Sequence, residues 1–517
     1  MSRLVSRLKL REESGFALVS VLVLLLVGTL FALAAWSSSK ADIAPAAQDR
    51  DSKQAYAAAE AGINFYLFRL GQNNAYWSDC ATIPSPNQND PVSLDTATTL
   101  KWRTLQGSTA QYAVELLPRP GLNPTPGSNW CTPGAAASGT LLDPASGTLQ
   151  IRSTGKYGNA RRSVVATLRR SGFLDYLYFT DFETLDPQVD GAGTNCAVYR
   201  RAGRSSACST IVFGTDDAVN GPLHTNDDII VCGTPDFGRT IADTVEVMAP
   251  APGWTAGCGG AAVPNFKGTW RTDAKQLTLP ASNSALSSVA LPGYLFTGTT
   301  QITINGSTMS VTNGGSTTSK SLPANGVIYV KNGASCGASY NGTGTQSYDE
   351  PTACGNVYVK GNYSSSLTIG ADRDIIVTDS LTRNGNVLLG LIANFFVRVY
   401  HPVTGTCPGA VNAASGPYGP APPALGITID AAILSLQHSF ITDNYKCGTS
   451  RGILTVNGAI GQFFRGPVGT IGGTGYIKNY NYDDRFRVAN PPYFLDPVQS
   501  SWRKIRYNEQ SPARQGG

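Results

Sequence analysis

The sequence predicts an α+β protein that is mostly β, with a long amino-terminal helix, a small β-sheet and a large β-helix-like domain. Three observations predict this fold class: one uncharged apolar run, many short stretches rich in β-branched residues, and 56 glycines among 517 residues. Ala, Glu, Lys, Leu and Arg do not dominate the composition, which excludes a coiled coil. A β-sandwich is the alternative for the large domain.

The amino-terminal helix is predicted from the apolar run Phe16 to Trp36, which holds 21 residues without a charge. At 1.5 Å per residue this helix is about 31 Å long, which matches the hydrocarbon core of a bilayer. No small-x-small cleavage site follows the run, so we expect it to be retained. The run is preceded by the basic residues Arg3, Arg7, Lys9 and Arg11. We therefore expect a single-pass inner-membrane protein whose amino terminus is cytoplasmic.

Beyond the apolar run, the sequence predicts that the helix continues to residue 71. Pro45 is expected to kink or interrupt it, because proline cannot donate the backbone hydrogen bond of a helix interior. The alanine-rich stretch from Gln54 to Asn64 is strongly helical, and Gly71 is a plausible stop. Residues 16–71 are therefore expected to form one membrane anchor and stalk.

The segment before the apolar run ends in Glu12-Glu13-Ser14-Gly15-Phe16, and residues 55–64 read AYAAAEAGIN. The first string resembles the class III signal of type IV prepilins, and the second resembles PilX-type minor pilins. The resemblance implies that residues 1–15 are a leader that prepilin peptidase removes between Gly15 and Phe16, and that Phe16 is then N-methylated. It also implies that the helix anchors the subunit in the membrane and later packs in the core of a filament. The alternative is a membrane-anchored surface protein with an alanine-rich stalk.

The fifth residue of the implied mature chain is Ser20. Major pilins of the resembled family carry glutamate there, and its carboxylate is thought to pair with the amino terminus of a neighbouring subunit. A buried charge needs such a partner, so a subunit with nothing above it can dispense with the carboxylate. Ser20 therefore favours a minor subunit at the tip, a feature shared with the tip pseudopilin of type II secretion.

The exported part is predicted to be β structure in two domains. Residues 72–171 are expected to form a pilin-like head, with strands at 111–117, 148–156 and 161–170. Residues 172–490 are expected to form the β-helix-like domain, because short apolar runs bounded by Gly, Asn and Asp recur there without helices between them. The runs are 224–232, 300–311, 326–331, 356–360, 367–378, 387–399, 427–436 and 453–464. Residues 491–517 are expected to be a carboxy-terminal tail.

Two further strings resemble the PilX-associated carboxy-terminal regions of large minor pilins. The first is Gly221 to Asn226 (GPLHTN), and the second extends from Gly458 to the tyrosine-rich stretch that ends near Phe494. The alternative interpretation is that they form turns and that the tyrosines cover the last exposed strand edge.

The ten cysteines predict disulfides, because the chain is expected to be exported and no C-x-x-C motif is present. Neighbours in sequence are one possible set of pairs, but the sequence leaves the connectivity open, and free buried thiols are the alternative. The candidates are Cys80, Cys131, Cys196, Cys208, Cys232, Cys258, Cys336, Cys354, Cys407 and Cys447.

No catalytic or metal site is predicted. Gly333 to Gly337 fits G-x-S-x-G, but no helix is expected after it, and Cys336 is better placed for a disulfide. We expect no cofactor and no enzyme activity. Calcium is the alternative, through the acidic pairs Asp216-Asp217, Asp227-Asp228 and Asp483-Asp484, although none of them lies in an EF-hand loop.

The predicted function is that of a minor pilin, which takes part in pilus assembly or in tip and surface adhesion. Its expected partners are prepilin peptidase, other pilin subunits, the inner-membrane assembly machinery and a host, surface or polysaccharide ligand. Nucleic acid is not expected, because the net charge of +5 is not gathered in a basic cluster. After processing the subunit would lie in the pilus or at the cell surface. The alternatives are a type II secretion tip pseudopilin and a membrane-anchored β-helix enzyme acting on polysaccharide.

Overall fold

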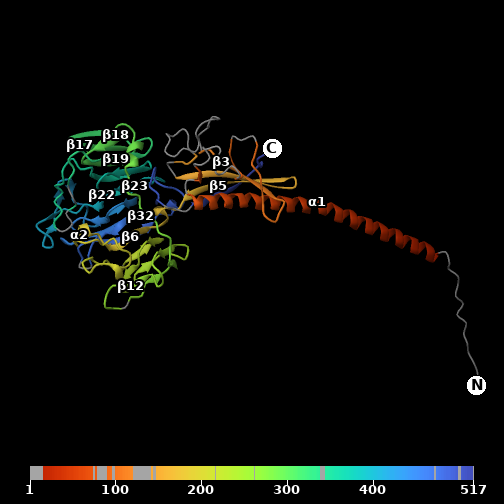
Figure 1. The fold of residues 1–517 in the computed structure, drawn as a ribbon, viewed down its shortest axis with the longest axis horizontal. Coiled ribbons are helices and arrows are strands. Elements are labelled where there is room, and N and C mark those ends of the chain that lie inside the picture. The colour runs from red at the N-terminus through yellow and green to blue at the C-terminus, as the bar shows by residue number, and fades with distance from the viewer. Residues whose placement is uncertain are drawn as a thin grey trace, which may run out of the picture.

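The computed structural model has three parts: a long helix, a small head beside its second half, and a large β-helical body (Figure 1). The predicted fold class, mostly β with an apolar amino-terminal helix, is confirmed. The residues that the structure describes are 16–73, 76–77, 90–95, 99–119, 141–143, 147–215, 217–260, 262–337, 340, 344–470, 473–498 and 502–515.

Helix α1 (Phe16–Gln72) is a single helix of 57 residues that passes through Pro45. The expected interruption at Pro45 is therefore wrong. Proline removes one intrahelical hydrogen bond and crowds the preceding turn, at a cost of about 3 kcal/mol. Helical turns continue on both sides of Pro45, so this local cost does not end the helix, although α1 bends between the head and its outer end (Figure 1).

The second half of α1 packs against the sheet of the head. Its buried side chains recur at helical spacing and form one stripe, which the outer half lacks. These side chains are Ala55, Ala58, Ala59, Ile63, Tyr66 and Leu70. The sheet has the order β1-β3-β4-β5-β34, with β2 at the side of β3, and only the β1–β3 pair is parallel. Its strands are β1 (Val92–Leu94), β2 (Arg103–Thr104), β3 (Gln111–Leu117), β4 (Thr148–Tyr157), β5 (Ala160–Arg170) and β34 (Trp502–Gln510).

Small residues allow the helix and the sheet to touch backbone to backbone. A Cβ atom added to Gly155 on β4 would lie 1.9 Å from the carbonyl oxygen of Ala55. A Cβ atom added to Gly62 on the helix would lie 2.1 Å from Oγ of Ser153. Real Cβ atoms do not approach other atoms this closely, so Gly155, which meets backbone, requires glycine, whereas at Gly62 the side chain of Ser153 would have to move. The alanine- and glycine-rich string at 55–64 is thus explained by close packing on β4.

The carboxy-terminal segment returns to the head. β34 pairs antiparallel with β5, from Trp502 opposite Arg170 to Gln510 opposite Ser163. Residues 491–517 are therefore not a separate tail, which corrects the domain boundary expected from the sequence. The physical reason is that the edge of β5 presents unpaired backbone groups, and a strand from the far end of the chain satisfies them. The body is consequently inserted between two neighbouring strands of the head sheet.

The body is a stack of coils in which each coil contributes strands to three faces. Neighbouring coils pair through parallel strands, which confirms a β-helix-like domain and rules against a sandwich of antiparallel sheets. In stacking order, the first face consists of β15 (Leu295–Thr297), β19 (Val327–Lys331), β21 (Leu367–Ala371), β23 (Leu389–Ala393), β30 (Ala432–Ser435), β32 (Ser450–Arg465), β6 (Tyr178–Leu185), β8 (Leu223–Thr225), β11 (Thr244–Val247) and β14 (Thr269–Arg271).

The second face follows the same order, and long strands such as β32 turn a corner and belong to two faces. It consists of β16 (Thr300–Gly306), β20 (Val357–Tyr363), β22 (Ile375–Arg383), β29 (Gly426–Ile429), β32, β33 (Gly475–Tyr482), β7 (Ala218–Asn220), β10 (Asp236–Phe237) and β13 (Asn265–Phe266). The third face has the first halves of β20 and β22, then β24 (Val397–Val399) and β31 (Phe440–Thr442). On the other side of the stack it has the pair β9 (Ile229–Val231) and β12 (Trp254–Ala256).

The coils are not stacked in the order of the sequence. The chain enters the body in the middle of the stack, at β6, and builds coils outward as far as β14. The crossing segment 272–294, which contains α3 (Ala285–Val289), then leads to β15 at the opposite end. From there the coils return until β32 pairs with β6 and β33 pairs with β7. We call this junction the seam; there the last coil of the chain meets the first.

The crossing segment is held against the outside of the first face by side-chain amides. Asn283 donates to the carbonyl oxygens of Ala371 and Ile392, at 2.9 and 2.7 Å. Near the other end of the segment, Asn226 donates to the carbonyl oxygen of Leu277 at 2.7 Å. The segment therefore spans several coils and ties both halves of the stack together.

The last strands of the stack are partly covered at the β16 end. β17 (Thr308–Asn313) and β18 (Ser316–Ser321) continue antiparallel from β16 and lie at the top of the body in Figure 1. Such a hairpin limits edge-to-edge association with other chains. The remaining short elements are η2 (Phe173–Asp175), α2 (Pro187–Asp190), η3 (Arg201–Gly203), η4 (Asp484–Arg487), β25 (Val403–Thr404), β26 (Val411–Asn412), β27 (Ser415–Gly416) and β28 (Gly419–Pro420).

Inside the coils, Val, Ile and Leu from the three faces form one continuous core. A buried ionic cluster lies beside it, where the fully buried Arg398 contacts Asp443 at 2.8 Å, Asp374 at 2.8 Å and Glu350 at 2.9 Å. Burial raises the pKa of Asp443 to about 6. The attraction to Arg398 does not cancel this rise, because three carboxylates share that one guanidinium.

Four disulfides join eight of the cysteines, each between neighbours in the sequence. They are Cys196–Cys208, Cys232–Cys258, Cys336–Cys354 and Cys407–Cys447. No free cysteine lies in the part of the chain that the structure describes. Cys80 and Cys131 lie outside the described residues, so their pairing stays a prediction.

Most strands expected from short apolar runs are present. β3 has the expected bounds, and β4 and β5 differ from the expected bounds by one residue. The runs 367–378 and 387–399 each form two strands, because the chain turns a corner of the coil within them.

We predict that Gly155→Ala destabilises the head by about 2 kcal/mol or more, because the added methyl group overlaps the backbone of α1. The measurement is the thermal unfolding midpoint of the purified full chain. Gly71→Ala is the matched control, since a Cβ atom there meets nothing within 4 Å. Equal midpoints for wild type and Gly155→Ala would contradict the close contact between helix and sheet.

Candidate assembly helix

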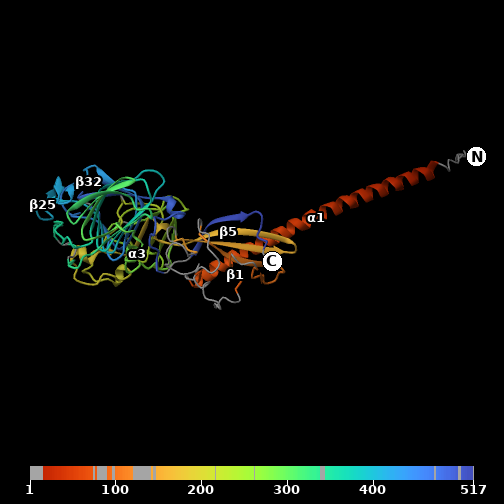
Figure 2. The ribbon, with the colours of Figure 1, turned by 90° about the horizontal axis from the view of Figure 1, so that it is seen from above.

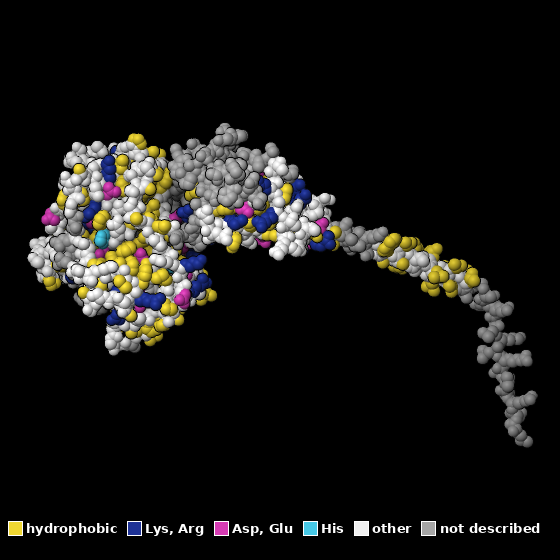
Figure 3. All heavy atoms as spheres, viewed as in Figure 1, with side chains coloured by type: hydrophobic (Ala, Val, Ile, Leu, Met, Phe, Trp, Pro, Cys, Tyr) yellow, Lys and Arg dark blue, Asp and Glu magenta, His cyan; other side chains and the backbone are white. Residues whose placement is uncertain are grey.

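The outer half of α1 carries an apolar surface that no other part of the described chain covers. The span Leu18–Ser37 has a mean hydropathy of 2.8, and none of it is buried. Leu24 and Phe31 are 71% and 73% exposed, and Figure 3 shows uncovered hydrophobic side chains along this part of the helix. Each such side chain left in water loses roughly 1.5–3 kcal/mol of the stabilising free energy that burial would give. The span therefore requires an apolar surrounding, either lipid or the helices of other subunits.

A charged segment separates this span from the head. Lys53 pairs with Asp49 at 2.7 Å, and Arg50 pairs with Asp51 at 2.9 Å, all on the exposed helix between the span and the packed stripe. The charges mark where the helix leaves the apolar surrounding. Alanines from Ala55 onward then contact the head sheet. One helix thus carries an apolar span, a polar boundary and a packed segment in succession.

Of the two residues of the predicted processing site, the structure describes only Phe16. Phe16 is the first residue of α1, whereas Gly15 lies outside the described residues. Ser20 lies one turn further along α1, inside the apolar span. The serine adds no charge there, so the span Leu18–Ser37 remains free of Asp, Glu, Lys and Arg. Cleavage at Gly15 and the role of Ser20 stay predictions.

The acidic pairs considered for calcium bond to protein groups. Asp227 accepts from the backbone of Glu183 at 2.8 Å and of Asp228 at 2.9 Å, and it also pairs with Arg204. Asp217 pairs with Lys478 at 3.0 Å; its neighbour Asp216 lies outside the described residues.

Asp483 and Asp484 likewise pair with arginines. Asp483 contacts Arg485 at 2.5 Å and Arg383 at 3.0 Å. The hydrogen bond from Arg239 holds the pKa of Asp484 below its usual value. Among the described residues, no group of three or more His, Cys, Asp or Glu is placed to hold a metal ion. Calcium binding stays an alternative that these contacts do not favour.

The G-x-S-x-G string forms a loop after β19. Cys336 within it bonds to Cys354 just before β20. The described residues between Gly337 and β20 contain no helix. The loop therefore lacks the strand–turn–helix geometry that a nucleophile elbow requires.

The two carboxy-terminal strings come together at the seam, which the sequence did not predict. Gly221 to Asn226 contains β8, and Gly458 to Gly461 lies in β32; β6 pairs with both strands. His224 of the first string lies 2.9 Å from Glu246 and 3.0 Å from Asn226, and it is buried. These contacts fix one coil at the seam. No local signal in either string reveals that β6 lies between them.

We predict that the double substitution Leu25→Arg with Leu26→Arg prevents stable membrane association of the full chain. Two arginines at the centre of a span make insertion less favourable by roughly 5–7 kcal/mol. The measurement is the fraction of protein that resists alkaline extraction from membranes. Phe68→Arg is the control, since Phe68 is 62% exposed on the same helix but beside the head. An unchanged fraction for the double variant would contradict the membrane role of the span.

The family comparison matches the part of the chain that contains this helix. A search of solved structures finds the competence-associated pilin ComZ from Thermus thermophilus, with 11% identity, a TM-score of 0.28, and coverage of 90% of this chain and 98% of that chain. The search of curated proteins finds no match. Residues 14–64 match the family model of the PilX N-terminal region, which covers the apolar span and the alanine-rich segment. The amino-terminal segment, residues 14–64, is thus PilX-like.

Proposed function

We propose that the protein is a minor pilin subunit of a type IV pilus, and that it takes part in pilus assembly and in adhesion at the tip or surface. One observation carries the proposal: the uncovered apolar span is continuous with a helix packed in a head, within the PilX-like segment. When the span and the head share one helix, packing of the span in a filament also fixes where the head lies. A flexible linker between them would leave the position of the head undetermined.

The same helix serves two surroundings. In the membrane, lipid covers the span, with the amino terminus cytoplasmic and the head and body exported. In a filament, the spans of neighbouring subunits cover one another. Transfer from lipid to a helix bundle exposes little apolar surface to water, so packing decides the equilibrium. Disulfides in the body are consistent with an oxidising compartment outside the cytoplasm.

Ser20 supports a place at the tip of the pilus. In the resembled family, the glutamate at the fifth mature position is thought to pair with the amino terminus of a neighbouring subunit. A tip subunit has no subunit above it and does not need this carboxylate. The same serine also favours a second candidate, a tip pseudopilin of type II secretion. The genes adjacent to this one distinguish the two systems.

We predict that the mature protein begins at N-methylated Phe16 when prepilin peptidase is present and keeps residues 1–15 when it is absent. The measurement is intact-mass and amino-terminal peptide mass spectrometry of protein from matched strains. Gly15→Val should retain the leader, whereas the control Gly28→Ala, where a Cβ atom meets nothing within 4 Å, should be processed normally. A mature start beyond residue 36 would end the proposal.

We also predict that Ser20→Glu changes where the subunit lies in the filament. A carboxylate at this position can pair with the amino terminus of an adjoining subunit, so the variant should enter the shaft as well as the tip. The measurement is immunogold labelling of the body on sheared pili. Ser37→Glu, at the far end of the span, is the control and should label like wild type. Wild-type label along the whole shaft would contradict a tip position.

A further inference from the structure

One coil of the body carries a long excursion that the β-helix does not need. Between β24 and β29 the chain leaves the stack over residues 402–425 and forms two small hairpins, β25–β26 and β27–β28. The adjacent coil makes the same passage from the third face to the second within the single strand β22. The excursion therefore has a role other than completing its coil.

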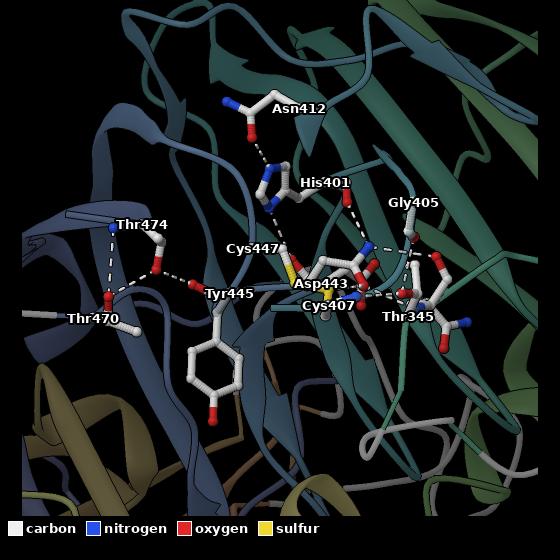
Figure 4. The surroundings of a disulfide bond; sticks show 12 residues. Thr345, His401, Gly405, Cys407, Asn412, Asp443, Tyr445, Cys447, Thr470 and Thr474 are labelled. Atoms are coloured by element: carbon white, nitrogen blue, oxygen red, sulfur yellow. Dashed lines mark hydrogen bonds between the residues drawn. A yellow bond between two sulfur atoms is a disulfide. The ribbon is translucent and has the colours of Figure 1, made fainter. Parts of the chain in front are cut away.

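The excursion is held firmly against two other loops, as Figure 4 shows. The disulfide Cys407–Cys447 joins it to the loop after β31. The hydroxyl group of Thr345 accepts from the backbone N–H of Cys407 at 3.0 Å and donates to the carbonyl oxygen of Gly405 at 3.2 Å. These links fix the surface in one arrangement, which lowers the entropy cost of binding a ligand.

A buried polar layer supports the loops from below. Asn444 accepts from the backbone of Gln346 at 2.7 Å and donates to the carbonyl oxygen of His401 at 2.8 Å. His401 lies 2.9 Å from Oδ1 of Asn412 and 3.1 Å from the carbonyl oxygen of Asp443 (Figure 4). Three segments far apart in sequence are thereby locked together beneath the same surface.

Two hollows open where these loops meet, and the smaller borders the disulfide. The larger has a volume of about 590 Å³ and the smaller about 170 Å³. Among the described residues, the larger is lined by Thr345, Gln346, Ser347, Tyr348, Pro402, Val403, Thr404, Gly405, Thr406, Ala413, Ser415, Gly416 and Pro417. The smaller is lined by Tyr340, Cys407, Tyr445 and Lys446, among others.

The lining of the larger hollow is rich in hydroxyl groups, and its described part contains no Asp, Glu, Lys, Arg or His. An anionic polymer would find no opposite charge there, and an apolar ligand would leave the hydroxyl groups without partners. The half-buried ring of Tyr445 adds an aromatic surface in the smaller hollow. This combination suits an uncharged ligand that carries many hydroxyl groups.

The hollows lie on the flank of the body that faces away from the helix. β25, which lines the larger hollow, is at the end of the molecule opposite the amino terminus in Figure 2. In the proposed filament, the assembly helix points toward the shaft and this flank points outward. A ligand on a surface would therefore meet these loops before the rest of the subunit.

We propose that the two hollows together form a binding site for a neutral oligosaccharide, with the larger hollow as its main part. A role of this site in adhesion rests on the proposed pilin function. Oligosaccharide binding itself requires only the folded body. Hydroxyl groups of Thr404, Thr406 and Ser415 would exchange hydrogen bonds with those of the sugar. The ring of Tyr445 would pack on a sugar face.

The test is titration of the purified full chain, in a detergent without a sugar headgroup, with maltohexaose, cellohexaose and chitohexaose. At least one neutral probe should bind, and Thr404→Trp and Ser415→Trp, which fill the larger hollow, should each weaken it at least tenfold. Ser319→Trp, an exposed serine on β18, is the matched control and should bind like wild type.

Three outcomes would overturn the inference. They are no binding of any neutral probe, equal loss in the control variant, and preferential binding of hexagalacturonate or single-stranded DNA at this hollow. Thermal unfolding of each variant shows whether a loss of binding results from misfolding. If one of the two tryptophan variants is misfolded, the binding measured for the other one tests the inference. Processing at Phe16 and labelling of pili are measured separately. Failure to bind sugar with normal processing overturns only this inference, and failed processing with sugar binding overturns only the pilin proposal.

Discussion

The pairing of β34 with β5 is the contact on which the arrangement of the whole molecule depends. It brings the last strand of the chain beside a strand that ends at Arg170, before the body begins. A solenoid built in one direction would leave its last coil at the far end of the stack, away from the head. The chain instead starts in the middle, builds one half, crosses over residues 272–294 and builds the other half back to its start. The order of the coils thus follows from the need to return to the head.

This order creates a seam that has to be specified, because any two parallel coils offer similar backbone partners. Charge pairs specify it: the buried Arg465 on β32 reaches the buried Glu183 on β6 at 3.3 Å, and the partly exposed Lys478 on β33 reaches Asp217 at 3.0 Å. Burial alone would raise the pKa of Asp217, but Lys478 and Arg465 outweigh that effect and lower it. Since an unpartnered buried charge is strongly destabilising, the last coil is stable only against the coil that carries its partners.

The sequence predicted what depends on local patterns and missed what depends on distant pairing. The apolar span, the helix to residue 71 and the strands β3, β4 and β5 follow from hydropathy, alternation and turn residues. The cysteines were predicted to form disulfides, but their pairing was left open, and the structure joins four pairs of sequence neighbours. The return of residues 502–510 could not be predicted, because an edge strand with several charged side chains resembles a solvated tail. The continuity of α1 through Pro45 was also missed, because a proline removes one hydrogen bond and leaves the rest of a long helix intact.

The candidate site divides in the same way. Phe16, Ser20 and the apolar span are visible in one short stretch of sequence. The distal hollows join residues near 345, 405 and 445, which only the stacking of coils brings together. The hydroxyl-rich segments that line them read as ordinary turns when taken one at a time.

Insertion of the body between neighbouring strands separates what assembles from what meets the surroundings. The chain leaves the head after Arg170 and re-enters it at Trp502, and these two residues face each other across the β5–β34 pair. The head sheet therefore depends on the distance between these two points and not on the number of coils between them. Coils can be added, or an excursion such as 402–425 enlarged, without altering the packing of Gly155 on α1. Selection on the outward flank and selection on the assembly helix then act on separate parts of one rigid subunit, and this independence accounts for a body several times larger than the head that carries it.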